Sequence, residues 1–347
     1  MVGNGANRYL LIVTIMNTDN SIKSVVKDLI KEYIKPKYPI YIISKGRFEN
    51  GLRLTQEMLE KYGVPYRMVV EDSEFDAYAE NVPEEKIIAL PKDFRENPLY
   101  AVRCEVTDTL GGSIPVRNFV YEHSKSEGHK RHWILDDNMA PLYRLHQNRK
   151  LQVESGSPFA ILESFVDRYT NVGMAGMNYD FIIPAISKRP PYVLNTRIYS
   201  CILLDNTLDI RWRGMYNEDT DISIRILKAG LCTMLFNCFL IGKAASMTMK
   251  GGNTQEVYAV DDPGGKETRG GEKFDKRRKF AESIASQHPD VARIAWKYDR
   301  WHHYVDYYRY KQKPILKSGL NIPKGNNEYG LVLKEFPKQL EKEVQYG

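Results

Sequence analysis

The sequence predicts an α/β fold in which a mainly parallel sheet is flanked by helices. From Tyr38 onward, short apolar segments typical of buried strands alternate with amphipathic segments typical of helices, and such alternation builds βαβ units. The chain has 347 residues, 42% hydrophobic and 27% charged, which suits one large α/β domain or two smaller ones. Polar loops directly follow two of the expected strands, at the edge where such sheets bind ligands.

The first half of the chain holds the clearest alternation. The amphipathic segment "LRLTQEMLEKYG" predicts a helix that ends at Gly63, and Pro115 is typical of the first turn of a second helix that runs to Gly128. Apolar runs around these helices predict strands. In chain order we expect strands at 38–44, 66–71, 86–91 and 132–138, and helices at 52–63 and 115–128.

The second half begins with a helix after Pro158 and becomes richer in strands. Apolar segments predict strands at 172–183, 195–206, 208–214 and 233–241. Asn217 is a natural helix cap and Gly230 a natural stop, so a helix is expected between them. We expect a strand and helix extension at 1–37, the main domain at 38–255, and a region at 256–347 in which a Gly-rich mobile loop (260–279) precedes further helices.

Two adjacent acids, Asp136 and Asp137, follow a mostly apolar strand in "HWILDDN". Neighbouring carboxylates repel each other unless a cation or hydrogen-bond donors offset them. At the strand end of an α/β sheet such a pair suits Mg²⁺ or Mn²⁺, which take oxygen ligands and often share them with a diphosphate. The alternative is a turn or helix cap, where Asp-Asp-Asn is common.

A second polar loop, Ser44 to Arg47, follows the first parallel strand. Gly46 lets the backbone approach a ligand, and Lys45 and Arg47 suit phosphate, although an ordinary turn explains the loop equally well. Arg117 lies early in the helix before the paired acids, so its guanidinium can reach the same crevice. For this residue a solvated helix face is the alternative.

The helix that begins at Asn217 carries a candidate base. Counting by three and four places Asp219 on the face of Ile222 and Ile226, toward the sheet, and pairs Asp221 with Arg225 on the outward face. An acid at the helix start that points toward the sheet suits proton transfer from a substrate hydroxyl. The alternative is that the acids only complement the helix dipole.

Basic charge is confined to the late part of the chain. Residues 266–317 hold 14 basic and 7 acidic side chains, whereas the whole chain carries +6, so the local excess of +7 predicts a polyanion partner. Within "RIAWKYDRWHHYVDYYRY" (293–310) aromatic residues recur at helical spacing among basic ones, which suits nucleic acid, or a helix packed on the core. The predicted DNA contacts are Lys276, Arg277, Arg278, Lys279, Lys297, Arg300 and Trp301.

Other features narrow the class of protein. The longest early apolar run, "YLLIVTIM", is shorter than a membrane span, and no clear secretory signal is present, so we expect a cytoplasmic protein with no membrane partner. The four cysteines form no CxxC pair and are expected to be free thiols. After a late strand, "KGGNT" at Lys250 offers backbone N–H groups that can wrap a phosphate.

These motifs together resemble the nucleotide-sugar glycosyltransferases of the GT-A fold. More narrowly, "PIYIISKGR" at Pro39, "PVRNFVYEHSKSEGHKRHWILDDN" at Pro115, "NEDTDISIRILKAG" at Asn217 and "KGGNT" resemble the bacteriophage and TET-associated DNA glycosyltransferases related to the base J glucosyltransferase. The resemblance covers about Tyr38 to Thr254. It implies a GT-A domain with an appended basic helical region, a UDP-sugar donor and a DNA acceptor.

The resemblance also implies roles for residues. Asp136 and Asp137 would correspond to the metal-binding DxD motif, although the spacing differs, and a late His ligand would have to come from His288, His302 or His303. Glu218–Asp219 would supply the base of an inverting transfer. The implied donor-site residues are Ser44, Lys45, Gly46, Arg47, Glu71, Arg117, Asn118, Gly251, Gly252 and Asn253.

The expected activity is transfer of glucose or arabinose from a UDP-sugar to the hydroxymethyl group of hydroxymethylcytosine or hydroxymethyluracil in DNA, assisted by Mn²⁺ or Mg²⁺. Two alternatives remain open. The same fold could glycosylate a protein or a cell-envelope acceptor, or the chain could bind nucleic acid without being an enzyme. Replacing the paired acids would leave DNA binding intact in the last case.

Overall fold

A computed structural model describes residues 35–97, 112–146, 149–184, 189–214, 216–244, 251 and 276–320. The predicted elements of the amino-terminal extension, before residue 35, lie outside the described residues. Residues 34–315 group into one compact unit, and the second unit, formed by residues 1–33 and 316–347, is described only at 316–320. The predicted domain boundary at 255 falls among residues that are not described, and the described residues 276–315 after it belong to the first unit.

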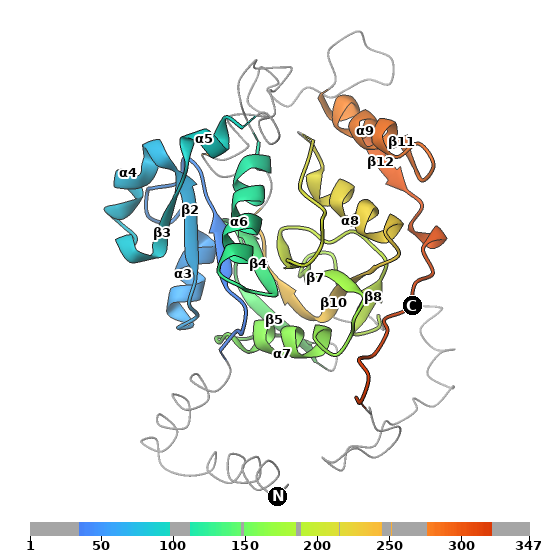
Figure 1. Ribbon diagram of the computed structural model, residues 1–347, viewed down its shortest axis with the longest axis horizontal. Coiled ribbons are helices and arrows are strands. Elements are labelled where there is room, and N and C mark those ends of the chain that lie inside the picture. Colours follow the sequence, from blue (N-terminus) through green and yellow to red (C-terminus); the bar gives the residue numbers. More distant parts are fainter. Residues whose placement is uncertain are drawn as a thin grey trace, which may run out of the picture. The chain divides into compact units, whose positions relative to one another are not determined.

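Ten of the described strands form one sheet in the order β3-β2-β1-β4-β9-β7-β10-β5-β6, with β8 also paired to β10 (Figure 1). The pairs among β1 to β4 and the β7–β10 pair are parallel, as predicted, and the pairs made by β9, β5, β6 and β8 are antiparallel. The strands are β1 (Ile40–Ile43), β2 (Arg67–Glu71), β3 (Ile87–Leu90), β4 (Arg131–Asp136), β5 (Leu142–His146), β6 (Arg149–Gln152), β7 (Val172–Tyr179), β8 (Tyr192–Leu194), β9 (Cys201–Asp205) and β10 (Cys232–Ile241).

Helices flank the sheet, and the element order follows the predicted alternation (Figure 1). Helix α6 packs on β4 and β1, α4 packs on β2 and β3, and α8 packs on β7 and β10. The α-helices are α3 (Leu54–Lys61), α4 (Phe75–Ala79), α5 (Lys92–Arg95), α6 (Ile114–Ser126), α7 (Ser157–Val166), α8 (Glu218–Lys228) and α9 (Lys276–Gln287), with 3-10 turns η1 (Asp72–Glu74), η2 (Glu84–Lys86) and η4 (Tyr307–Arg309).

The centre of the sheet is apolar on both faces, because helices cover both. Trp133, Ile134 and Leu135 of β4 are fully buried, and every residue of β7 is buried. Gly173 and Gly176 of β7 allow neighbouring segments to approach closely. A Cβ at Gly176, for example, would lie 2.2 Å from the carbonyl oxygen of Cys201 on β9. The sequence predicted these strands correctly because a continuous apolar run between two helical layers has few other stable arrangements.

The region after residue 291 differs from the prediction. Instead of a helix, β11 (Ala292–Lys297) and β12 (Arg300–Val305) form an antiparallel hairpin that packs with α9. Tyr298 and Asp299 form its two-residue turn, and both have positive φ, of 53° and 55°, as a type I′ turn requires. The helical spacing of the aromatic residues was misleading because alternating large side chains also fill the two faces of a hairpin.

Smaller predictions were also wrong. Residues 208–214 do not form a strand, and α9 already begins at Lys276, inside the segment predicted as loop. Asn217 precedes α8 but makes no side-chain cap; it has φ of 55°, and its Nδ2 donates to the carbonyl oxygen of Phe280.

The cysteines at 201, 232 and 238 are free, as predicted. Among the described helices, none combines the length and apolar character needed to cross a membrane.

Candidate functional site

The loop after β1 is held by side chains from the α4 region. The Ser44 hydroxyl lies 2.7 Å from the Tyr78 hydroxyl, and the Arg47 backbone N–H donates to the same oxygen at 3.0 Å. The Gly46 N–H donates to a Glu74 carboxylate oxygen at 2.8 Å. Tyr78 is fully buried and was not predicted as a site residue. Its sequence surroundings, a short helix after β2, gave no indication that it supports this loop.

The Asp137 side chain binds the loop after β1 and is not open to the crevice. One carboxylate oxygen accepts from the Ser44 hydroxyl at 2.6 Å, and the other forms a close ion pair with the Arg47 guanidinium. Only 6% of its side chain is exposed, and this burial raises the pKa of the Asp137 carboxyl to about 6, even though Arg47 and Ser44 act to lower it. The carboxylate therefore ties the loop to the end of β4.

Asp136 has a different environment, although it is the next residue. Its Oδ2 accepts from the Lys243 ammonium and the Ser200 hydroxyl, each at 2.7 Å, and its Oδ1 lies 3.3 Å from the Arg117 guanidinium. Burial would raise the pKa of Asp136, but the positive charges of Lys243 and Arg117 lower it to about 2. The paired acids thus face apart, and each has its own cation.

Lys243 was missed by the sequence analysis. It follows the carboxyl end of β10, and its ammonium also lies 2.6 Å from the Ser200 hydroxyl. Burial acts to lower the pKa of Lys243, but the Asp136 charge raises it above its ordinary value, so the side chain is protonated at neutral pH. The sequence feature that could have identified Lys243 is its place directly after a buried strand, because strand ends in such sheets line ligand sites.

Arg117 contacts both Asp136 and Glu218. The sequence predicted that its guanidinium would reach the paired acids. Its Nε lies 3.2 Å from a Glu218 carboxylate oxygen and 3.0 Å from the Ser113 hydroxyl, and its guanidinium stacks on Trp212 at 4.8 Å. In the part of the chain that the structure describes, its buried Nη1 has no hydrogen-bond partner. An Arg donor without a partner beside Asp136 suits an anionic oxygen of a ligand.

Asn118 does not reach the crevice. It is fully buried, its Nδ2 donates to the Trp212 carbonyl at 2.9 Å, and its Oδ1 accepts from the Trp212 N–H at 2.9 Å. Both ends of the amide are therefore used to fix the backbone of Trp212, on which Arg117 stacks. Asn118 therefore has a structural role instead of the predicted contact with the sugar donor, because helical geometry turns consecutive side chains to different faces.

The structure also brings the other predicted loops together. Glu71, at the end of β2, lies 3.5 Å from the Lys45 ammonium and 2.5 Å from the Arg95 guanidinium. Gly251 has φ of +83°, and a Cβ there would lie 2.3 Å from the Gly46 carbonyl oxygen, so the backbone of this glycine packs directly on the loop after β1. Gly252 and Asn253 lie outside the described residues.

Glu218 and Asp219 begin α8 and face different neighbours. Glu218 accepts from the Ser113 hydroxyl at 2.9 Å beside Arg117, and burial raises the pKa of its carboxyl. Asp219 is half-buried, and its Oδ1 accepts from the Thr220 N–H at 2.7 Å. Among the described residues, the hydrogen bonds to this carboxylate come from the Thr220 N–H and hydroxyl, and both go to Oδ1.

Asp221 was predicted to point outward and does not. Only 1% of its side chain is exposed, because α9 and the segment before α8 cover that face of the helix. The expected pair with Arg225 forms at 3.3 Å, and Arg213 and His288 also bind the carboxylate, at 2.9 Å and 2.8 Å. His288 therefore serves the α8–α9 contact rather than a metal site.

The predicted DNA contacts lie apart from the donor crevice on the hairpin and α9. Lys297 and Arg300 flank the hairpin turn and are exposed. The Trp301 ring packs edge-on against Trp296 at 5.2 Å and lies beneath the Arg278 guanidinium at 5.4 Å. Lys279 is half-buried on α9, whereas the side chains of residues 276 and 277 are outside the description.

The two acids differ in how well they suit a divalent ion. Asp136 keeps 23% of its side chain exposed and Asp137 only 6%, although both oxygens of each carboxylate already have partners. Within the described ranges, no group of three or more His, Cys, Asp or Glu side chains could hold a metal ion. An ion at Asp136 would therefore have to displace Lys243 or Arg117 from the carboxylate, and its remaining ligands would have to come from a bound anion or water.

Comparison with known proteins shows the family of this chain. A family model described as TET-Associated Glycosyltransferase matches residues 38–252, more than half of the chain. The chain belongs to this family. No curated protein matches it. A glycosyltransferase uses a sugar donor and an acceptor, and the matched segment contains the loop after β1, the paired acids, Arg117 and the start of α8.

Proposed function

We propose that this glycosyltransferase transfers glucose or arabinose from a UDP-sugar to the hydroxymethyl group of a 5-hydroxymethylpyrimidine, hydroxymethylcytosine or hydroxymethyluracil, in DNA. The observation that carries the proposal is the chain of contacts from Asp136 through Arg117 to Glu218, with Asp219 directly beside it. This chain joins a site suited to a diphosphate to a carboxylate suited to proton transfer. Membership of the family supports both halves.

The donor would lie along the carboxyl ends of β1, β2 and β4. The loop from Ser44 to Arg47 and the Glu71 carboxylate would face the nucleoside, and the close approach of Gly251 to Gly46 shapes the floor of that part. The free Nη1 of Arg117 and the Lys243 ammonium would meet the diphosphate oxygens. Both cations would stabilise the charge that grows on the leaving diphosphate.

A divalent ion, Mn²⁺ or Mg²⁺, is part of the proposal and would be held by Asp136. When bound it would act as a Lewis acid on the diphosphate and lower the charge of the leaving group. Lys243 now neutralises that carboxylate, so its ammonium would shift toward the diphosphate when an ion is present. Asp137 would keep its role in fixing Arg47 and Ser44.

Asp219 would act as the general base of an inverting transfer. As the acceptor hydroxyl oxygen attacks the anomeric carbon, its proton moves to Oδ2 of Asp219, and the bond from that carbon to the diphosphate oxygen breaks. The electron pair leaves with UDP. Glu218, which Arg117 and Ser113 hold in place, would orient the donor side of the crevice rather than take this proton.

The basic surface of α9 and the hairpin would contact the DNA backbone. Lys297 and Arg300 are exposed at the hairpin turn, next to Tyr298, whose side chain is 86% exposed. Cationic groups at a protruding turn suit phosphates, and an exposed aromatic ring suits a base or sugar face. Binding should therefore weaken as salt rises.

The test is incubation of the protein with duplexes that carry hydroxymethylcytosine or hydroxymethyluracil, with UDP-glucose or UDP-arabinose, and with Mn²⁺. Mass spectrometry of the DNA nucleosides should show the added sugar, and duplexes with unmodified pyrimidines serve as controls. UDP release without any mass gain on DNA would assign the acceptor to a protein or envelope polymer. DNA binding without UDP release from any donor would point to a non-enzymatic role.

A further inference from the structure

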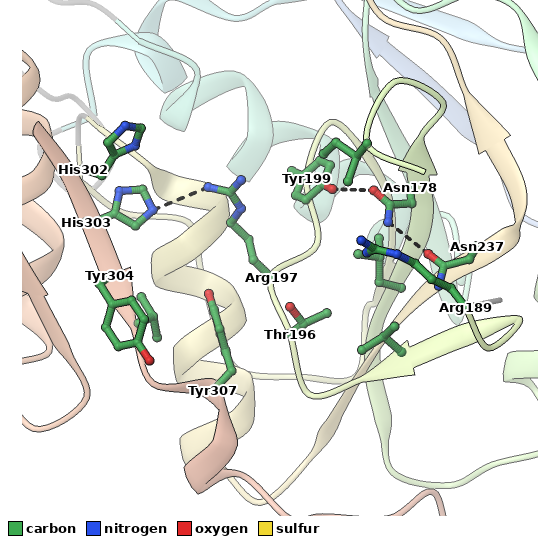
Figure 2. A pocket seen from close by; sticks show the side chains of 14 residues that line it. Asn178, Arg189, Thr196, Arg197, Tyr199, Asn237, His302, His303, Tyr304 and Tyr307 are labelled. Atoms are coloured by element: carbon green, nitrogen blue, oxygen red, sulfur yellow. Dashed lines mark hydrogen bonds between the residues drawn. The ribbon is translucent and has the colours of Figure 1, made fainter. Parts of the chain in front are cut away.

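A separate pocket of about 480 Å³ lies between Asn178, Arg197 and the hairpin residues His303 and Tyr304 (Figure 2). Its walls come from the segment before β9, from the end of β7, from the middle of β10, and from β12 of the hairpin. The lining is polar and aromatic, and its main members are Asn178, Arg197, Tyr199, His303, Tyr304 and Tyr307. Nothing in the donor crevice described above uses this cavity.

Arg197 is the charged group of the pocket, and its contacts are weak. Its Nη1 lies 3.4 Å from the Thr220 hydroxyl and 3.5 Å from the His303 ring nitrogen, at the long limit for hydrogen bonds. The guanidinium stacks over Tyr199 at 4.8 Å. In the described part of the chain no carboxylate lies within ion-pair distance of it. A guanidinium this poorly bonded has donors to spare for a ligand.

Tyr307 supplies a second incomplete contact. Its hydroxyl oxygen is buried and has no hydrogen-bond partner among the described residues, and Figure 2 shows it directed into the cavity on the Arg197 side. A buried hydroxyl without a partner costs free energy, and native proteins seldom leave one in that state unless a ligand or water completes it. The same pocket therefore contains two donor groups, from different elements, that lack good acceptors.

The pocket adjoins the proposed base. The charge of Asp219 raises the pKa of Arg197 above its ordinary value against the effect of burial, and Thr220, the next residue, bonds both Arg197 and the Asp219 carboxylate. On the far side Tyr199 precedes Ser200, which bonds Asp136. Asp219 does not itself line the pocket, but Thr220 connects its carboxylate to Arg197.

The remaining chemistry of the lining is that of a flat heterocycle site. Burial and the neighbouring Arg197 charge lower the pKa of His303 to about 4, so its ring is neutral at pH 7 and presents one donor and one acceptor. Tyr304, whose ring lies 4.6 Å from the Arg293 guanidinium, and Tyr199 offer aromatic surfaces. Aromatic faces combined with amide, imidazole and guanidinium groups suit stacking and edge contacts with a base.

We propose that this pocket is the acceptor site and holds a single pyrimidine nucleotide turned out of the DNA, with its 5-hydroxymethyl group directed at Asp219. Arg197 and the Tyr307 hydroxyl would donate to a ring carbonyl or phosphate oxygen, and a tyrosine ring would stack on the base. The inference rests on the proposed DNA glycosyltransferase function. A base inside a duplex cannot reach a cavity of this kind, so extrusion follows from its position.

The hairpin explains how the nucleotide would arrive. Strand β12 lines the pocket with His303 and Tyr304, and the same hairpin ends in the exposed turn that carries Lys297 and Arg300. Phosphate contacts at the turn would place the duplex over the pocket mouth. One rigid element would then both hold the backbone and form a wall of the base site.

The test compares Tyr307→Phe with Tyr308→Phe. The first variant removes only the unpartnered hydroxyl, so the fold should be unaffected, and the second removes the hydroxyl of a neighbouring tyrosine whose side chain is 81% exposed and does not line the pocket. Steady-state transfer to a duplex with one hydroxymethylpyrimidine gives separate KM values for DNA and donor. A 2-aminopurine beside that base reports extrusion by fluorescence without donor.

We expect Tyr307→Phe to raise the KM for DNA about threefold to tenfold, the range of one lost hydrogen bond, and to reduce the fluorescence gain, with the donor KM unchanged. Tyr308→Phe should match the wild type. An unchanged DNA KM, or a rise in the donor KM alone, would overturn the acceptor assignment while transfer to DNA still stands. If the wild type modifies no DNA at all, the proposed function itself fails, and the inference with it.

Discussion

The crevice around Asp136 and the pocket around Arg197 differ in how their charges are balanced. In the crevice Asp136, Asp137 and Glu218 each contact a lysine or arginine. In the pocket Arg197 has only long contacts and Tyr307 has an unused hydroxyl. A charged ligand in the crevice must exchange partners with existing ion pairs, whereas a ligand in the pocket completes bonds that are missing.

The largest effect should come from Asp219, the proposed base. Asp219→Asn keeps the side-chain shape but cannot take the hydroxyl proton, so kcat should fall about 100-fold to 10,000-fold with the donor KM little changed. The matched control is Asp209→Asn, at a fully exposed position. Stopped assays of DNA mass gain measure both. Wild-type turnover by Asp219→Asn would remove this residue as the base.

A smaller effect should follow from disturbing the crevice alone. Gly251→Ala places a Cβ against the Gly46 carbonyl, so the loop after β1 must move and the donor KM should rise on the order of tenfold. Gly230→Ala is the matched control, since it also has a positive φ, of +81°, but no atom lies near its added Cβ. The DNA KM should be unchanged in both variants, which steady-state transfer at varied UDP-sugar and DNA concentrations would check.

The two adjacent acids should give opposite pH dependence of stability. The folded-state pKa of Asp137, about 6, is above the ordinary value of 3.8, so its contribution to the free energy of unfolding falls as pH rises from about 4 to 6. The folded-state pKa of Asp136, about 2, is below that value, so its contribution is fully present above about pH 4 and is lost as pH falls toward 2.

Urea unfolding of the wild type, Asp136→Asn and Asp137→Asn at pH 7, 5 and 3 measures this difference. From pH 7 to 5 the wild type should gain stability relative to Asp137→Asn and keep a constant difference from Asp136→Asn. At pH 3 the free energy of unfolding of the wild type should decrease relative to that of Asp136→Asn. Identical pH profiles for the two variants would mean that the acids share one environment.

The smallest effect should come from the hairpin turn. Lys297 does not line the pocket, although its ammonium lies 5.5 Å from the ring of Tyr304, which does. Lys297→Ala chiefly removes one exposed cation, so DNA affinity should fall about equally for modified and unmodified duplexes. The slope of log affinity against log salt should decrease by about 0.9, the value for one phosphate contact. Fluorescence anisotropy over a range of salt concentrations measures it. An unchanged slope would place the DNA elsewhere.

The crevice could be predicted from sequence because its residues follow strands directly. The loops after β1 and β4 lie on neighbouring parallel strands, in which Ile43 pairs with Asp136, so their side chains had to meet. The hairpin could not be predicted in this way. Spacing between the aromatic residues of 293–310 fits a helix and a strand pair almost equally, and the turn at Tyr298 and Asp299 lacks the usual glycine.

The sequence by itself determined the alternation of strands and helices, the place of the polar loops and the reach of Arg117, because these depend on local periodicity and on strand ends. Only the tertiary structure decided that Asp136 pairs with Lys243, 107 residues away, that Asn118 fixes the backbone of Trp212, and that β12 lines a pocket together with Arg197. Such contacts depend on how distant segments pack, and no local pattern of residues encodes the distance between them.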